Sequence, residues 1–227
     1  MILYLFDIDG TLLHAHGSGR EAFDTVFGER HKIENASEGI RYGGKTDPQI
    51  IREIFEARMG RAPTTEEVDG FLDAYIPLLR TLLERNRVIV IEGVIAALTD
   101  LAKRDGVMLG VATGNIRRGA REKLEAAKLT SWFDVVDVGG YGCDSAVRSE
   151  LVARAIERGR ERGATGEVIV VGDTIHDISA ARACNATVVA VATGADPADK
   201  LSHADVVLAS LAELPAWHAR RFDADRP

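Results

Sequence analysis

Ile2-Leu3-Tyr4-Leu5-Phe6-Asp7-Ile8-Asp9-Gly10-Thr11 is the most informative stretch of this chain. It is a continuous apolar run that ends in two acidic residues, a glycine and a threonine. Continuous hydrophobicity is typical of a strand that is buried on both faces of a parallel sheet. We therefore predict a central strand over Ile2–Phe6. Ligands of open α/β sheets bind outside the carboxyl ends of the strands, which makes Asp7 and Asp9 candidate site residues.

Further apolar runs resemble the first, and each stops at a polar or glycine-rich turn. They cover residues 107–112, 133–138, 168–171, 187–192 and 205–208. Segments with helical periodicity separate most of them, and one of these carries an apolar stripe of Val94, Ile95, Leu98, Leu101 and Ala102. Alternating strand and helix patterns predict an α/β fold with a doubly wound parallel sheet and right-handed crossovers.

The connection between the first two predicted strands is too long for a single crossover. It spans roughly 100 residues, whereas the loops of α/β units take about 2–6. Residues 93–104 supply the crossover helix. We predict that residues 15–87 form a small all-helical domain inserted into a core of residues 1–14 and 88–227.

Three amphipathic stripes in the insert predict three helices, with members such as Phe23, Ile51 and Leu79. Asp47 followed by Pro48 predicts the cap and first turn of the second helix. Pro77 predicts a bend in the third helix. After Glu213 we expect a short terminal helix.

The composition narrows the class of protein. The 227 residues include 35 acidic and 28 basic ones, which gives a formal net charge of −7. That balance argues against nucleic-acid binding, which depends on neutralising phosphates. The start of the chain has no signal-peptide pattern, and no stretch reaches the ~18 apolar residues of a membrane helix. Two cysteines are too few for a disulfide framework. We expect a cytoplasmic protein that binds neither nucleic acid nor membrane, and the sequence does not indicate its oligomeric state.

Polar residues also follow two other predicted strands. Thr113-Gly114-Asn115 ends the second strand and precedes a helical segment, an arrangement that binds anions at a helix N-terminus. Asp173 ends the fourth strand, and Asp177 lies four residues later. Arg148 opens a predicted helix before the fourth strand, where its guanidinium could bind a phosphoryl oxygen or Asp7.

These acids are expected to meet at one edge of the sheet. Four carboxylates at that edge would repel one another unless a cation were present. Oxygen ligands without a histidine or cysteine cluster favour a hard ion such as Mg²⁺. A magnesium site beside an anion-binding helix start predicts phosphate chemistry.

In order, these residues resemble the four motifs of the haloacid dehalogenase-like hydrolase superfamily. The motifs are Asp7-x-Asp9-Gly-Thr, Thr113, a basic residue before the fourth strand, and Gly172-Asp173-x-x-x-Asp177. The resemblance covers about residues 1–14 and 88–212, and the helical insert is similar to the C1 type of cap in that family. The phosphoglycolate-phosphatase-like branch is the most similar. The third motif usually carries a lysine, and Arg148 stands in its place here.

The resemblance implies a two-step phosphoryl transfer. Asp7 would attack phosphorus and form an aspartyl-phosphate, and Asp9 would serve as the general acid and then the general base. The resemblance also implies a Mg²⁺ cofactor held by Asp7, the main-chain carbonyl of Asp9, and Asp173, with Asp177 ordering a metal-bound water. Thr113, Gly114 and Asn115 would hold the phosphoryl group of a small phosphorylated substrate, with Arg148 nearby.

Asp9 points to the reaction class, but the substrate stays open. Dehalogenases and phosphonate-cleaving relatives of this superfamily lack an acid at that place, so Asp9 favours a phosphatase. Lys45 lies in the glycine-rich loop 43–47, which could close over the site, and a contact with substrate is favoured over a Schiff base. We expect a phosphomonoester such as 2-phosphoglycolate. Nucleotidase, sugar phosphatase, pyrophosphatase or phosphomutase activity, or a non-enzymatic phosphoacceptor module, are the alternatives.

Overall fold

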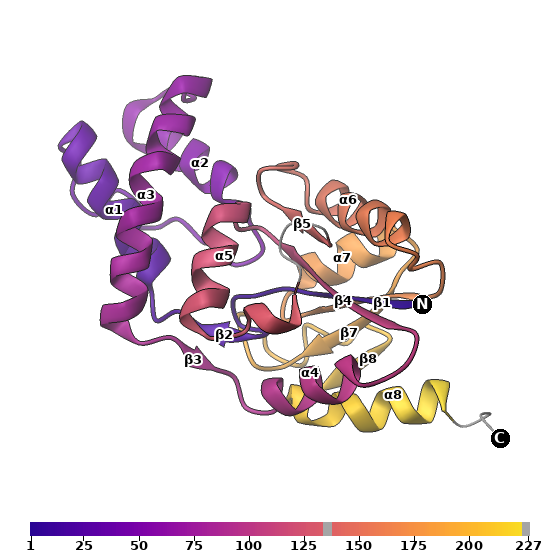
Figure 1. Ribbon diagram of the computed structural model, residues 1–227. Helices are drawn as coiled ribbons and strands as arrows, with labels where there is room; N and C mark the ends of the chain where they lie inside the picture. The colour runs from indigo at the N-terminus through magenta and orange to yellow at the C-terminus, as the bar shows by residue number, and fades with distance from the viewer. Residues whose placement is uncertain (134–137, 224–227) are drawn as a thin grey trace.

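A six-stranded parallel sheet forms the centre of the molecule (Figure 1). The computed structural model describes residues 1–133 and 138–223. The sheet has the strand order β5-β4-β1-β6-β7-β8. Its strands are β1 (Ile2–Phe6), β4 (Val107–Thr113), β5 (Gly139–Tyr141), β6 (Val168–Gly172), β7 (Thr187–Val191) and β8 (Val206–Leu208). The order confirms the doubly wound α/β fold, because the chain adds strands first on one side of β1 and then on the other.

Helices cover both faces of this sheet. One face packs against α4 (Val94–Ala102), α5 (Arg117–Ala126) and α8 (Leu214–Phe222), and the other against α6 (Arg148–Glu161) and α7 (Ile175–Ala183). Two short 3-10 helices, η1 (Thr130–Trp132) and η2 (Leu211–Glu213), complete the core. α8 is the terminal helix that the sequence predicts. The part of that prediction that concerns residues 224–227 lies outside the described residues.

A second, all-helical layer stands beside the core (Figure 1). It consists of α1 (Ser18–His31), α2 (Asp47–Met59) and α3 (Thr65–Asn86), which share an apolar core of their own. At its centre the ring of Phe71 contacts the rings of Phe23 and Phe27. The inserted helical layer is therefore confirmed.

The chain passes between the two layers through a short antiparallel ribbon of β2 (Leu13–His14) and β3 (Ile89–Val90). Leu13 pairs with Val90, and His14 pairs with Ile89. We propose that this ribbon marks the domain boundary near residues 14 and 88, where the sequence analysis places it.

Two local predictions are wrong in detail. The third core strand lies at Gly139–Tyr141, within a stretch that reads as a turn, whereas most of the predicted strand, 134–137, lies outside the described residues. The reason is packing, because a Cβ on Gly140 would stand 1.9 Å from the carbonyl oxygen of Leu151 in α6. Glycine in a strand often marks such a close approach of another backbone.

The start of α2 is the second correction. Thr46 caps this helix, since its hydroxyl accepts a hydrogen bond from the amide of Gln49 at 3.3 Å. Asp47 occupies the first helical position instead, and its carboxylate is free to bond elsewhere. Pro77 does lie inside α3, and the helix continues through it.

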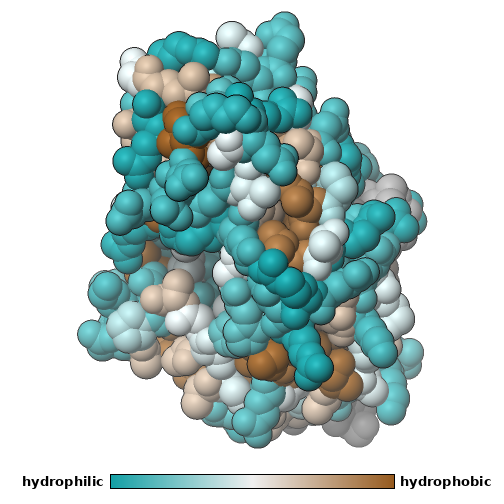
Figure 2. All heavy atoms as spheres, turned by 90° about the vertical axis from the view of Figure 1, so that its left-hand side faces the viewer, coloured by the Kyte–Doolittle hydropathy of each residue, from teal (hydrophilic) through white to brown (hydrophobic). Residues whose placement is uncertain are grey.

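Apolar residues are largely confined to the interior. Figure 2 shows the side that carries the inserted helices, where hydrophilic residues predominate and hydrophobic ones form small separate patches. Among the described residues, none of the helices combines the length and apolar character required to cross a lipid bilayer.

Candidate active site

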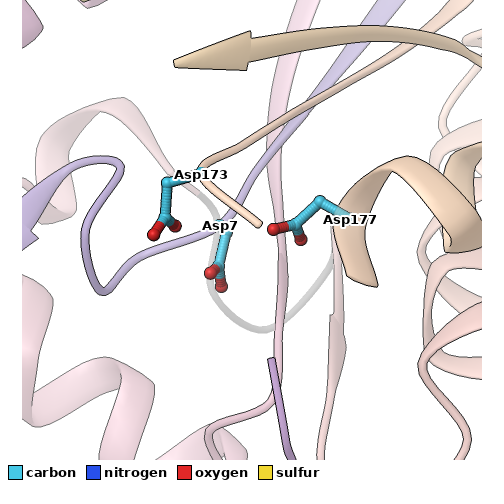
Figure 3. A group of neighbouring side chains, drawn as sticks. All are labelled: Asp7, Asp173 and Asp177. Atoms are coloured by element: carbon cyan, nitrogen blue, oxygen red, sulfur yellow. The ribbon is translucent and has the colours of Figure 1, made fainter. Parts of the chain in front are cut away.

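Three carboxylates from two strand ends and one helix converge in the core (Figure 3). Asp7 follows β1, Asp173 follows β6, and Asp177 lies in the first turn of α7. One oxygen from each lies within 4.8 Å of the other two, and all three residues are buried. The predicted meeting of positions 7 and 173 at one sheet edge is therefore observed. Figure 3 shows the three side chains around a common space.

Burial makes this group electrostatically costly. Loss of solvent, followed by repulsion from Asp7 and Asp177, raises the pKa of Asp173 to about 8. Burial also raises the pKa of Asp7 to about 6, although the positive charge of Arg148 opposes the shift. Carboxylates that are hard to ionise together are typical of a site that is completed by a cation.

Asp173 has hydrogen-bond donors but, among the described residues, no cationic side chain within ion-pair distance. The hydroxyl of Thr11 donates to its Oδ1 at 3.1 Å, and the amide of Ala195 donates to its Oδ2 at 2.6 Å. The backbone approaches it closely, since a Cβ on Gly10, which has φ +83°, would stand 2.5 Å from Oδ2. One hydroxyl and one amide, neither of them charged, thus hold the carboxylate in place.

Arg148 supplies the positive charge on the other side of the group. It begins α6, and its side chain is only 9% exposed. Its Nε and Nη2 donate to Asp177 Oδ1 at 3.0 and 2.6 Å, and Nη2 lies 3.1 Å from Asp7 Oδ2. Asp177 also accepts bonds from the hydroxyl and amide of Thr174, which caps α7. The structure therefore places Arg148 beside Asp7, as the sequence suggests.

Asp9 points to a different set of partners. Its Oδ2 accepts bonds from Lys123 Nζ at 2.6 Å and from Asn115 Nδ2 at 2.8 Å. Lys123 also donates to Asn115 Oδ1 at 2.7 Å. The three residues form a closed triangle at the carboxyl end of β4.

Lys123 is the site residue that the sequence analysis missed. It lies on α5 at the spacing of the buried residues Ile116, Ala120 and Ala127, so it occupies a position that the helical period assigns to the interior. A lysine on an apolar stripe needs a buried partner. A charged residue at an interior helix position is therefore the sequence signal by which Lys123 could have been found.

The motif after β4 lies where predicted. Thr113 is fully buried, and its Oγ1 accepts bonds from the Asn115 amide at 3.3 Å and from its side-chain Nδ2 at 2.8 Å. Gly114 packs against the loop that precedes α2, because a Cβ there would stand 2.0 Å from the carbonyl oxygen of Lys45. All three residues line the same cavity as Asp7 and Asp9.

The loop at residues 42–47 covers this cavity from the side of the insert. The amide of Asp47 donates to the carbonyl of Gly114, and Asp47 Oδ2 accepts a bond from the amide of Ile116, each at 2.9 Å or less. Gly44, at φ +75°, packs against His176. Lys45 lines the cavity and pairs with Glu53 of α2. The loop predicted to close over the site is in contact with the core.

The cavity between core and insert has a volume of about 630 Å³. Carboxylates and cations line its core side, and the side of the insert contributes Phe23, Tyr42, Ile50 and Tyr75 among others. Its volume is in the range of small-molecule sites.

A sequence model of the haloacid dehalogenase-like hydrolase family matches residues 4–191. This chain belongs to that family. The match spans the whole of the acidic cluster, Arg148 and the helical insert, so the resemblance stated from four short motifs is confirmed, and the chain is an enzyme of a hydrolase family. The haloacid dehalogenase-like hydrolases include relatives of similar length.

The "Probable phosphatase IndB" of Dickeya dadantii is 28% identical over 204 residues, which cover 89% of this chain and 86% of that protein. The pyrophosphatase PpaX of Oceanobacillus iheyensis is 23% identical over 220 residues, which cover 92% of this chain and 93% of that protein. A hydrolase from Pseudomonas syringae has a similar structure, with a TM-score of 0.73, 23% identity, and coverage of 98% of this chain and 99% of that one. These likenesses extend over both the core and the insert.

Proposed function

We propose that this haloacid dehalogenase-like hydrolase is a Mg²⁺-dependent phosphatase that acts through an aspartyl-phosphate on Asp7. The observation that carries the proposal is the buried group of Asp7, Asp173 and Asp177 with Arg148 against it. The relative named as a phosphatase supports the same reaction class.

The residues present fit a magnesium ion. The donor set is oxygen only, one oxygen of each carboxylate lies within 4.8 Å of the others, and burial raises the pKa of Asp7 and of Asp173. Asp7, the main-chain carbonyl of Asp9, and Asp173 would hold the ion, and Asp177 would order a water beside it. When bound, the ion would offset the negative charge of the transferring phosphoryl group.

Asp7 and Asp9 divide the chemistry of the two steps. The Asp7 carboxylate attacks phosphorus as the bond to the leaving oxygen breaks, and Asp9 gives its proton to that oxygen. Water then attacks the aspartyl-phosphate, Asp9 takes up a proton from it, and inorganic phosphate leaves with Asp7 restored. Arg148, Thr113 and the amides of Gly114 and Asn115 would hold the phosphoryl oxygens during both steps.

The cavity favours a small phosphomonoester, for which 2-phosphoglycolate is our candidate. Its volume of about 630 Å³ suits a small leaving group, and the loop at 42–47 contacts the core beside it. Lys45 would contact the leaving group from the side of the insert. Pyrophosphate is the second candidate, and it is favoured by the likeness to a relative named as a pyrophosphatase.

The proposed place of action is the cytoplasm. Both cysteines, Cys143 and Cys184, are free thiols, as they would be in a reducing compartment.

Replacement of the nucleophile tests the proposal. Wild-type protein should release inorganic phosphate from p-nitrophenyl phosphate when Mg²⁺ is present and stop when EDTA is added. Asp7→Asn should reduce turnover by at least about a thousandfold, since the covalent step is lost. Asp69→Asn, on the exposed face of α3, is the matched control and should retain full turnover.

Two results would contradict the proposal. Near wild-type turnover by Asp7→Asn would exclude this nucleophile. A single stoichiometric phosphorylation of wild-type protein by acetyl phosphate, without turnover, would favour the phosphoacceptor module instead. A screen of 2-phosphoglycolate, pyrophosphate, sugar phosphates and nucleotides would then identify the substrate.

A further inference from the structure

Lys123 places a buried cation beside the second motif aspartate. The side chain is 7% exposed, and it extends from α5 to the cavity that contains Asp9. Its Nζ lies 2.6 Å from Asp9 Oδ2 and 2.7 Å from Asn115 Oδ1. Withdrawing an ammonium group from water is costly unless its hydrogen bonds are satisfied, so these contacts specify one position for the group.

The same network leaves the two oxygens of Asp9 unequal. Oδ2 receives two donors, Lys123 Nζ and Asn115 Nδ2. Across residues 1–133 and 138–223, no donor is within hydrogen-bond range of Oδ1, and the Asp9 side chain is 44% exposed at the cavity. Oδ1 is therefore the oxygen available for proton exchange with a bound substrate.

The cations of the site are also separated. Arg148 contacts Asp7 and Asp177, whereas Lys123 contacts Asp9. Lys123 lies on α5. The loop at 42–47 is hydrogen-bonded to residues at the start of this helix, so the position of Lys123 depends on how the insert meets the core.

We propose that Lys123 is the positioning residue of Asp9: with Asn115 it fixes Oδ2 and leaves Oδ1 to protonate the leaving group. The inference rests on the proposed phosphatase function. It adds a residue that acts through Asp9 and does not itself exchange a proton with substrate.

Two aryl phosphates of similar shape separate this role from a purely structural one. p-Nitrophenol leaves readily as an anion, whereas phenol, a much weaker acid, depends on protonation as the bond breaks. Lys123→Met should lower the single-turnover rate of phenol release from phenyl phosphate at least about tenfold more than that of p-nitrophenol release from p-nitrophenyl phosphate. Arg121→Met is the matched control, since Arg121 lies exposed on the same helix and pairs with Glu125.

A double-mutant cycle shows whether the effect passes through Asp9. In an Asp9→Asn background, Lys123→Met should cause no further increase in the rate difference between the two esters. Lys123→Gln, which keeps an amide donor without the charge, gives a second variant if Lys123→Met does not fold, and it should fall between wild type and Lys123→Met.

Equal slowing of both esters by Lys123→Met, or full additivity with Asp9→Asn, would overturn the inference. In either case the proposed function would stand, provided that wild type turns over and Asp7→Asn does not. Absence of wild-type turnover would instead reject the proposed function.

Discussion

At the scale of single residues, the site gives each motif aspartate a different environment. Asp7 is buried against Arg148, whereas Asp9 is half-exposed and bonded to Lys123. A nucleophile must be ionised, and the charge of Arg148 lowers the pKa of Asp7 against the opposing effect of burial. The guanidinium therefore both stabilises the carboxylates and favours the reactive form of Asp7.

Removal of Arg148 tests this dual role. Arg148→Met should lower kcat/KM about a hundredfold and destabilise the fold by about 3–5 kcal/mol, because the buried carboxylates of Asp7 and Asp177 lose their ion-pair partner. Arg148→Lys should be intermediate, since it keeps the charge without the forked contact to Asp177. Arg154→Met, exposed on the same helix, is the control for both activity assays and urea unfolding. Full activity of Arg148→Met would show that another group activates Asp7.

The sequence predicted which residues meet at the site better than it predicted the contacts among them. Each of the predicted residues lies at the end of a regular element or just after one, so their shared location follows from the topology; they are Asp7, Asp9, Thr113, Arg148 and Asp173. The bond between Lys123 and Asp9 joins positions 114 residues apart. A single sequence gives no measure of such a pairing unless a charge interrupts an apolar stripe.

At the scale of elements, helix starts connect the insert to the core. Asp47 in the first turn of α2 accepts the amide of Ile116 at the start of α5, and its own amide donates to Gly114. Sequence reasoning assigned Asp47 to its own helix cap, because local capping is the usual use of an aspartate there. In the structure the Asp47 carboxylate bonds to α5 instead, and Thr46 caps α2.

Elements with continuous apolar patterns were predicted almost to the residue, as in β1 and β4. The glycine-rich strand β5 was not, because local turn propensity outweighed an interaction that exists only after α6 packs on it. The periodicity of apolar residues indicates which positions are buried, but it does not indicate where two backbones approach closely.

Ionisation of Asp47 should make the free energy of unfolding depend on pH. Burial raises its pKa to about 6, above the ~3.9 of an unfolded chain. Its contribution to stability is therefore complete below about pH 4 and is lost as the pH rises through 6. Asp47→Asn cannot ionise, so its free energy of unfolding relative to wild type should increase by up to about 3 kcal/mol between pH 4 and pH 8.

Urea unfolding of both proteins at several pH values measures this difference. Asp69→Asn, an exposed replacement of the same kind, shows the effect of removing one surface charge. A stability difference between Asp47→Asn and wild type that does not change with pH would contradict the buried ionisation of Asp47.

At the scale of the whole molecule, the fold brings three buried carboxylates together beside Arg148. β1 and β6 are neighbours in the sheet, so the acids that follow them meet at one edge. The alternation of strands and helices predicted this topology, because right-handed crossovers leave few alternative arrangements. The position of the insert over that edge was expected only through the family resemblance, and its contacts come from the structure.

Divalent metal should therefore stabilise the folded protein in a pH-dependent way. Burial raises the pKa of Asp7 to about 6 and that of Asp173 to about 8, so the stabilisation that these groups give in their protonated forms is lost as the pH rises through those values. Metal binding requires the deprotonated forms.

At pH 8, Mg²⁺ at a hundredfold excess over its Kd should add about 2.7 kcal/mol to the free energy of unfolding and raise Tm by several degrees. At pH 5.5 the increase should be smaller. Calorimetry with and without EDTA measures both, and Asp173→Asn should lose most of the increase at pH 8. An equal increase in Asp173→Asn would place the bound ion elsewhere, because Asp173 is the carboxylate of the cluster that no cationic side chain of residues 1–133 and 138–223 pairs with.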